Sequence, residues 1–213
     1  MPSPQKRRII EKTRKREKLG RIYLIVALVL IAIVAVGVFA YASSQSPKIM
    51  YAKLNTSYGT IEIELYGNSA PKTVNNFVNL ANSGFYSNLL WHRVAKGFVI
   101  QTGDPNTRSS DNSTWGKGGS PQTVPLEVDS SLHNYAGYLG IAHSSLTTEG
   151  SSQFYINLKD NSIPLDKQYT VFGKVISGMD VANTIGNVPV YTPPDGQPIG
   201  PVYLTSVTIS NSP

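Results

Sequence analysis

One stretch of the chain, Trp91 to Pro105, has side chains in an order that ordinary strands and turns do not require. It reads WHRVAKGFVIQTGDP, with Arg93 followed five residues later by Phe98 and then, after three more, by Gln101. Arginine presents a planar fork of N–H donors and stays charged at any relevant pH. Two strands joined by a Lys96-Gly97 turn would account for much of the pattern. They would not account for the order of these three side chains.

Other reactive residues form no recognisable centre. The chain has no cysteine, which excludes disulfides, thiolate metal sites and cysteine nucleophiles. The three histidines, His92, His133 and His143, stand at no metal-ligand spacing. Serines 151–152 lack a nucleophile-elbow pattern. We expect no metal and no cofactor, and we expect His92 to be a buried, hydrogen-bonded histidine rather than a general base.

The stretch resembles the motif FHR…GF.IQ.GD of the cyclophilins, and three later segments agree with that family. These are Gly116–Gly119, similar to its glycine-rich loop; Gly140–His143 with Ser152–Ile156, similar to MAN…SQFFI; and Leu165-Asp166 with Tyr169–Val175, similar to LD…VFGKV. The segments follow the family's order and cover nearly all of residues 48–210. The resemblance implies a mainly β fold, an eight-stranded antiparallel β-barrel capped by two α-helices. It also implies a substrate groove on the outer barrel surface and rotation about X–Pro peptide bonds.

The resemblance also implies roles for individual residues. The expected catalytic set is Arg93, matching the family's catalytic arginine, with Gln101, which orients it and holds substrate backbone, and Phe98. The expected substrate-binding set forms the proline pocket and the peptide groove: Val99, Ala142, His143, Gln153, Tyr155, Leu165 and Tyr169.

Several of these positions depart from the family pattern. Val99 stands where methionine is frequent, and Tyr155 stands where phenylalanine is frequent; both changes keep the pocket apolar. The Tyr155 hydroxyl then needs a partner or water. His143 replaces asparagine, and Tyr169 replaces histidine. Pro164 stands in place of a tryptophan whose indole N–H binds cyclosporin, so we expect cyclosporin binding to be weakened.

The implied reaction has a simple physical requirement. Amide resonance sets a rotation barrier of about 18–20 kcal/mol, and it is lost when the bond is twisted. The prolyl nitrogen then regains a lone pair and accepts a hydrogen bond. A donor aimed at that nitrogen therefore binds the transition state selectively, which is what raises a rate. An apolar wall assists by holding the ring and excluding water.

The apolar patterns predict many short strands and few helices. Strands are expected at 51–56, 60–66, 90–93, 98–101, 137–142, 153–158, 171–175 and 202–210. Glu62 and Glu64 alternate with apolar residues and should form a solvated strand face. Helices are expected at 70–81, ended by Gly84, and at 178–185. Residues 189–201 are rich in proline and glycine and are expected to be a loop. The pattern favours a barrel or sandwich with helical caps.

The charge of the chain lies mostly in its first residues. Residues 1–21 contain nine basic and two acidic side chains, a net +7, while the remainder has 10 basic and 11 acidic side chains. Residues 22–42 follow directly, without charge or proline, and are long enough to cross the hydrocarbon core. We therefore expect a basic cytoplasmic tail at 1–21, a transmembrane helix or signal anchor at 22–42, a linker at 43–47 and an isomerase domain at 48–213.

This organisation predicts a single-pass protein of the cell membrane with its catalytic domain outside the cytoplasm. A cleaved signal peptide is the alternative, since Ala40-Tyr41-Ala42 resembles a cleavage site, and the domain would then be secreted. Expected partners are proline-containing segments of exported or membrane proteins, with no nucleic acid, and the domain is expected to be monomeric. The rival function is a proline-segment-binding chaperone or interaction module without catalysis.

Overall fold

The computed structural model describes residues 28–36, 49–144 and 146–213. Within these residues, ten strands form one antiparallel sheet in the order β3-β10-β1-β2-β8-β6-β7-β5-β4-β9. Their bounds are β1 Met50–Thr56, β2 Gly59–Leu65, β3 Leu89–Leu90, β4 Arg93–Ala95, β5 Val99–Thr102, β6 Tyr138–Ile141, β7 Phe154–Asn157, β8 Val171–Ser177, β9 Asp195–Gly196 and β10 Tyr203–Ser210.

The order of the strands requires the sheet to curl. Only Trp91 and His92 separate β3 from β4, yet these strands lie near opposite ends of the sheet. Three peptide steps reach about 10 Å, so the two ends must approach each other. Among the described residues the edge strands β3 and β9 do not pair with each other. The expected mainly β, antiparallel fold is confirmed, but the expected eight-stranded barrel is corrected: within the described residues the sheet is a curled half-barrel of ten strands. Its two additional strands have two residues each, too few to show a periodicity.

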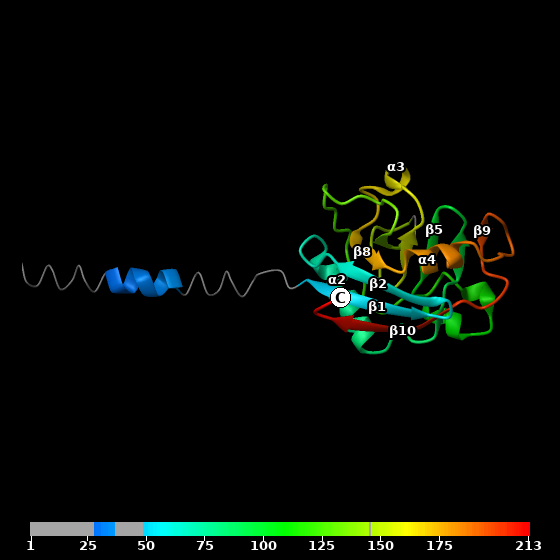
Figure 1. Cartoon of the computed structure of the whole chain (residues 1–213), viewed down its shortest axis with the longest axis horizontal. Coiled ribbons are helices and arrows are strands. Elements are labelled where there is room, and N and C mark those ends of the chain that lie inside the picture. The colour runs from blue at the N-terminus through cyan, green and yellow to red at the C-terminus, as the bar shows by residue number, and fades with distance from the viewer. Residues whose placement is uncertain (1–27, 37–48, 145) are drawn as a thin grey trace, which may run out of the picture. The chain divides into compact units, whose positions relative to one another are not determined.

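The first hairpin confirms the period-two prediction. Ile61 and Ile63 are fully buried, and β1 pairs with β2 from Met50 opposite Leu65 to Thr56 opposite Gly59. On the other face, Lys53 Nζ lies 2.9 Å from Glu62 Oε1, so that face carries an ion pair. In Figure 1, β1 lies between β2 and β10, as the pairing requires.

The strand expected at 90–93 is divided in the structure. Leu90 pairs with Tyr203 of β10, whereas Arg93 pairs with Gln101 of β5. Between them, the Trp91 backbone N–H donates to Val202 O at 2.8 Å, and the Trp91 side chain is fully buried. The chain thus changes its pairing partner within two residues, and one apolar run becomes two strands.

Both expected helices are confirmed as α2, Pro71–Asn82, and α4, Met179–Gly186. Gly84 follows α2 at φ +73°, the left-handed conformation expected of it. A single α-helical turn, α3, spans Ser162–Leu165, and two short 3₁₀ helices lie at Pro105–Arg108 and Asn112–Thr114. Sequence patterns did not predict these three short elements. The loop at 189–201 is also shorter than expected, because it contains β9.

Part of the expected membrane segment lies outside the described residues. Residues 28–36 are helical. No helix in the described part of the chain has both the length and the apolarity needed to cross a bilayer. The expected tail at 1–21, the linker at 43–47 and both ends of the 22–42 segment lie outside the described residues.

Candidate active site

Strand register brings the predicted site residues to one face of the sheet. Arg93 on β4 pairs with Gln101 on β5, which pairs in turn with Tyr155 on β7. Successive side chains of a strand point to opposite faces. Ile100 and Phe154, from the alternate positions, are therefore buried in the main core on the inner face, and the Arg93–Gln101–Tyr155 row lies on the outer face.

A second apolar cluster, which we call the outer pocket, lies on this outer face and is separate from the main core. Three partly buried side chains pack against the buried members of this cluster: Phe98, Ala142 and Tyr169. The buried members are Ala95, Val99, Tyr155 and Leu165. Leu165 comes from α3, so this short helix supplies one wall of the outer pocket. Six of the ten predicted site residues meet here.

A chain of hydrogen bonds runs from Arg93 to the glycine-rich loop. Arg93 Nη1 donates to Gln101 Oε1 at 3.1 Å, and Gln101 Nε2 donates to Gln153 Oε1 at 2.8 Å. Gln153 Nε2 then donates to the backbone oxygens of Gly116 at 3.1 Å and Gly118 at 2.6 Å. Gln153 is buried. It holds Gln101 and the loop in place, and it also lines the groove beside them.

Asp104 holds the other side of the glycine-rich loop. Its carboxylate is fully buried and accepts hydrogen bonds from the backbone N–H groups of Gly116, Gly118 and Asn106. A methyl group at Gly118 would lie 2.3 Å from Asp104 Oδ1, so only glycine fits there without movement. The chain turns at Gly103, whose φ is +92°, and the buried carboxylate that follows supports the glycine-rich loop.

The Tyr155 hydroxyl has a protein partner. It donates to Asn134 Oδ1 at 2.8 Å, and Asn134 in turn donates from its backbone and side-chain nitrogens to Asp166 Oδ1 at 2.8 and 3.1 Å. Burial raises the pKa of Tyr155, so the phenol stays neutral. His133 Nδ1 also lies 2.6 Å from Asp166 Oδ2. This network lets a tyrosine occupy a pocket position where the family often has phenylalanine.

A groove continues from the outer pocket toward the glycine-rich loop. It is lined by Gln101, Gly118, Ala142 and His143 among others. The His143 ring stacks on Tyr169 with centroids 4.4 Å apart, and its Nε2 lies 2.8 Å from Gln168 O. Tyr169 also meets Tyr155 edge-on at 5.9 Å. The predicted groove residues are therefore in contact with the pocket residues.

His92 is only 3% exposed, as expected. By distance and angle, neither ring nitrogen has a hydrogen-bond partner within the described part of the chain. The Leu90 backbone and the Gln153 side chain nevertheless lie near enough to act on the pKa of the ring, so the expected hydrogen bonding stays a prediction. Burial lowers the pKa of His92 to about 4, with Asp104 partly offsetting this effect. The imidazole is therefore neutral at pH 7 and enclosed, which does not suit a general base.

Sequence reasoning missed one charged neighbour of Arg93. Asp195 accepts from Arg93 Nε at 2.8 Å and from Nη2 at 2.5 Å, across 102 residues of sequence. Asn134 was also missed. Neither residue lies in a segment with a recognised motif, so no local pattern indicated them.

The assembled site can do a limited kind of chemistry. It presents a charged donor beside an apolar cluster on the outer face of the sheet. It holds no group of three or more metal-ligating side chains within the described residues. Such a site suits reactions in which a group with a developing lone pair is stabilised by a hydrogen bond, and in which no covalent intermediate forms.

Comparisons with known proteins agree with this chemistry. The family model described as "Cyclophilin type peptidyl-prolyl cis-trans isomerase/CLD" matches residues 51–209. A "Peptidyl-prolyl cis-trans isomerase" of Acinetobacter baylyi is 37% identical over 165 residues, covering 75% of this chain and 85% of the relative. "Peptidyl-prolyl cis-trans isomerase-like 3" of Homo sapiens is 37% identical over 166 residues, covering 77% of this chain and 98% of the relative.

The fold is shared with solved structures of the same family. The crystal structure of a Cryptosporidium parvum cyclophilin type peptidyl-prolyl cis-trans isomerase superposes with a TM-score of 0.69 at 30% identity, covering 78% of this chain and 99% of that one. A second crystal structure of that protein, in the presence of the dipeptide Ala-Pro, superposes with a TM-score of 0.67 at 31% identity, covering 75% and 98%. The present chain therefore belongs to the cyclophilin family and is a peptidyl-prolyl cis-trans isomerase.

Proposed function

We propose that Arg93 is the catalytic residue of this isomerase and that the outer pocket binds the proline ring. The observation that carries this proposal is the row in which Gln101 holds Arg93 Nη1 at 3.1 Å, directly beside the outer pocket. A proline seated in the outer pocket would bring its ring nitrogen near the guanidinium. The donor would then form its best hydrogen bond only when the amide is twisted.

The outer pocket and the groove would bind different parts of the substrate. Phe98, Val99, Tyr155 and Leu165 present apolar surface to the ring, which excludes water from the amide. Ala142 and His143 lie along the groove, where the rest of the peptide would run. No nucleophile is required, because no covalent bond is made or broken.

The expected contribution of Arg93 can be estimated. A hydrogen bond from a charged donor contributes about 1.5–3 kcal/mol, and each 1.36 kcal/mol corresponds to tenfold in rate. Arg93→Ala should therefore lower kcat/KM by about 10- to 100-fold. Cis-to-trans exchange of a proline peptide would be measured for both proteins, with retained peptide binding as the control.

The experiment separates the catalytic role from the rival, binding-only role. Acceleration by wild type with loss in Arg93→Ala supports the proposal. Equal acceleration by both proteins would remove Arg93 from its role. Peptide binding without any acceleration by wild type would leave only a proline-binding module.

We further propose that residues 22–42 anchor the protein in the cell membrane, with the isomerase domain outside the cytoplasm, acting on exported or membrane proteins. The support is the 21-residue segment without charge or proline, preceded by a block of net charge +7. Protease added to intact cells should degrade the domain while leaving the basic tail protected. Release of the whole domain into the medium would instead indicate cleavage after Ala42, and a protease-resistant domain would contradict the proposed topology.

A further inference from the structure

We propose that Asp195 is a positioning residue, which holds the Arg93 guanidinium in the orientation that catalysis needs. This inference rests on the proposed role of Arg93. Asp195 accepts from Nε at 2.8 Å and from Nη2 at 2.5 Å, so the two groups form a bidentate pair along one edge of the guanidinium. Paired contacts of this kind set the orientation of the guanidinium plane as well as its position.

The three bonds to Arg93 leave donors available for a substrate. A guanidinium has five N–H groups. Asp195 takes the one on Nε and one on Nη2, and Gln101 takes one on Nη1. One N–H on Nη1 and one on Nη2 therefore remain. The Asp195 carboxylate and the Gln101 amide bind two different edges of the Arg93 guanidinium. Because both edges are held, the guanidinium cannot rotate freely, and its two remaining N–H donors keep a fixed direction.

The backbone places Asp195 where it can reach this arginine. In the register of β4 with β9, Ala95 lies opposite Asp195 and Val94 opposite Gly196. Arg93 is two residues from Ala95 on the same face, so it reaches Asp195 diagonally. Diagonal neighbours on a sheet are within reach of long side chains.

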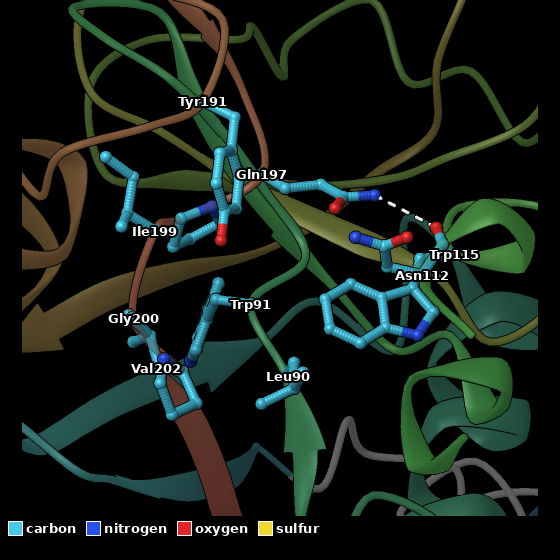
Figure 2. Close-up of a pocket in the computed structure, with 11 residues that line it drawn as sticks. Leu90, Trp91, Asn112, Trp115, Tyr191, Gln197, Ile199, Gly200 and Val202 are labelled. Carbon is cyan, nitrogen blue, oxygen red and sulfur yellow. Dashed lines mark hydrogen bonds between the residues drawn. The ribbon is translucent and has the colours of Figure 1, made fainter. Parts of the chain in front are cut away.

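Hydrogen bonds within and around the loop at residues 189–201, which carries Asp195, hold this loop in place without the ion pair to Arg93. Lys96 N donates to Pro194 O at 2.8 Å, and Tyr191 N donates to Gln197 O at 2.9 Å. Figure 2 shows a further bond, in which Gln197 Nε2 donates to Asn112 O at 3.1 Å beside a cavity of about 140 Å³ that Trp115 and Tyr191 help to line. The carboxylate therefore comes from a loop that is already held against its neighbours.

The solvent exposure of the Arg93–Asp195 pair allows a positioning role to be distinguished from a role in stabilising the fold. The Arg93 and Asp195 side chains are 38% and 43% exposed. Exposed ion pairs add little to the free energy of folding. Removing Asp195 should therefore leave the thermal midpoint almost unchanged while changing the orientation of Arg93. This difference makes the role measurable.

The test compares five forms of the full chain: wild type, Asp195→Ala, Asp195→Asn, Arg93→Ala and the Arg93→Ala/Asp195→Ala double variant. Proline-peptide isomerisation is measured over substrate concentrations that separate kcat from KM. We expect Asp195→Ala to lower kcat by about fivefold with KM unchanged, because the remaining donors are no longer aimed. Asp195→Asn keeps one carbonyl oxygen and should recover part of the loss. In the Arg93→Ala background, Asp195→Ala should change nothing further.

Glu62→Gln is the matched control, since it alters the partly exposed Lys53–Glu62 pair on the hairpin of β1 and β2 and should leave kcat unaltered. A further loss in the double variant would mean that Asp195 acts through the fold and not through Arg93, which overturns the inference. So would an unchanged or raised kcat in Asp195→Ala. If Arg93→Ala itself keeps full activity, the proposed function fails and this inference fails with it. If only Arg93→Ala loses activity, this inference alone is wrong.

Discussion

The buried His92 imidazole should make the stability of this protein depend on pH. Burial lowers the pKa of His92 from its ordinary value of 6.5 to about 4. Between these two values the unfolded chain binds a proton that the folded chain does not bind. Stability is therefore complete above pH 6.5 and is lost as the pH falls toward 4.

The size of this effect follows from the two pKa values. Each unit of difference corresponds to about 1.36 kcal/mol. Binding of the proton by the unfolded chain should lower the free energy of unfolding by about 2 kcal/mol at pH 5 and by about 3 kcal/mol at pH 4. The window from pH 8 to 5 is the more informative one, because most carboxylates remain ionised there.

The assay is denaturant unfolding of the full chain at several pH values, with wild type compared to His92→Met. Methionine has a similar volume, and neither imidazole nitrogen has a hydrogen-bond partner among the described residues. The variant should therefore lose less than about 1.5 kcal/mol at pH 8. Its stability should also fall much less between pH 8 and 5. His143→Gln, which removes a partly exposed histidine elsewhere in the domain, is measured alongside as the comparison variant. An identical slope in His92→Met and wild type would refute the reasoning.

Three further predictions concern the pocket and its supports. Tyr155→Phe removes the 2.8 Å bond to Asn134, so unfolding should become easier by about 1 kcal/mol while kcat/KM stays unchanged; a large loss of activity would show that the hydroxyl touches substrate. Gly118→Ala forces a methyl group to within 2.3 Å of Asp104 Oδ1, so the loop must shift. The free energy of unfolding should then fall by about 1–3 kcal/mol, measured by thermal unfolding, and KM should rise. Pro164→Trp restores an indole donor and should tighten inhibition by cyclosporin, whereas an unchanged inhibition constant would refute the weakened binding that we expect of wild type.

The local features of the fold follow from the sequence alone. The alternation around Glu62 and Glu64 predicted the strand at 60–66, where Ile61 and Ile63 are buried. The apolar pattern at 70–81 predicted the helix α2, whose buried residues include Val74 and Phe77. These predictions succeeded because side-chain periodicity reports which face of a strand or helix is buried. The motif around Arg93 identified the family for the same local reason, since its residues lie on two strands joined by one turn.

Only the tertiary structure decided which distant groups complete the site. The curl of the sheet divides the run at 90–93 into β3 and β4, and it leaves β9 to pair with β4. That pairing brings Asp195 to Arg93, and the packing of the loops brings Asn134 to the hydroxyl of Tyr155. Side-chain periodicity cannot predict such contacts. They depend on the order of the strands in the sheet, which differs from their order along the chain. The arginine can thus be recognised from the sequence, whereas the carboxylate that holds it cannot.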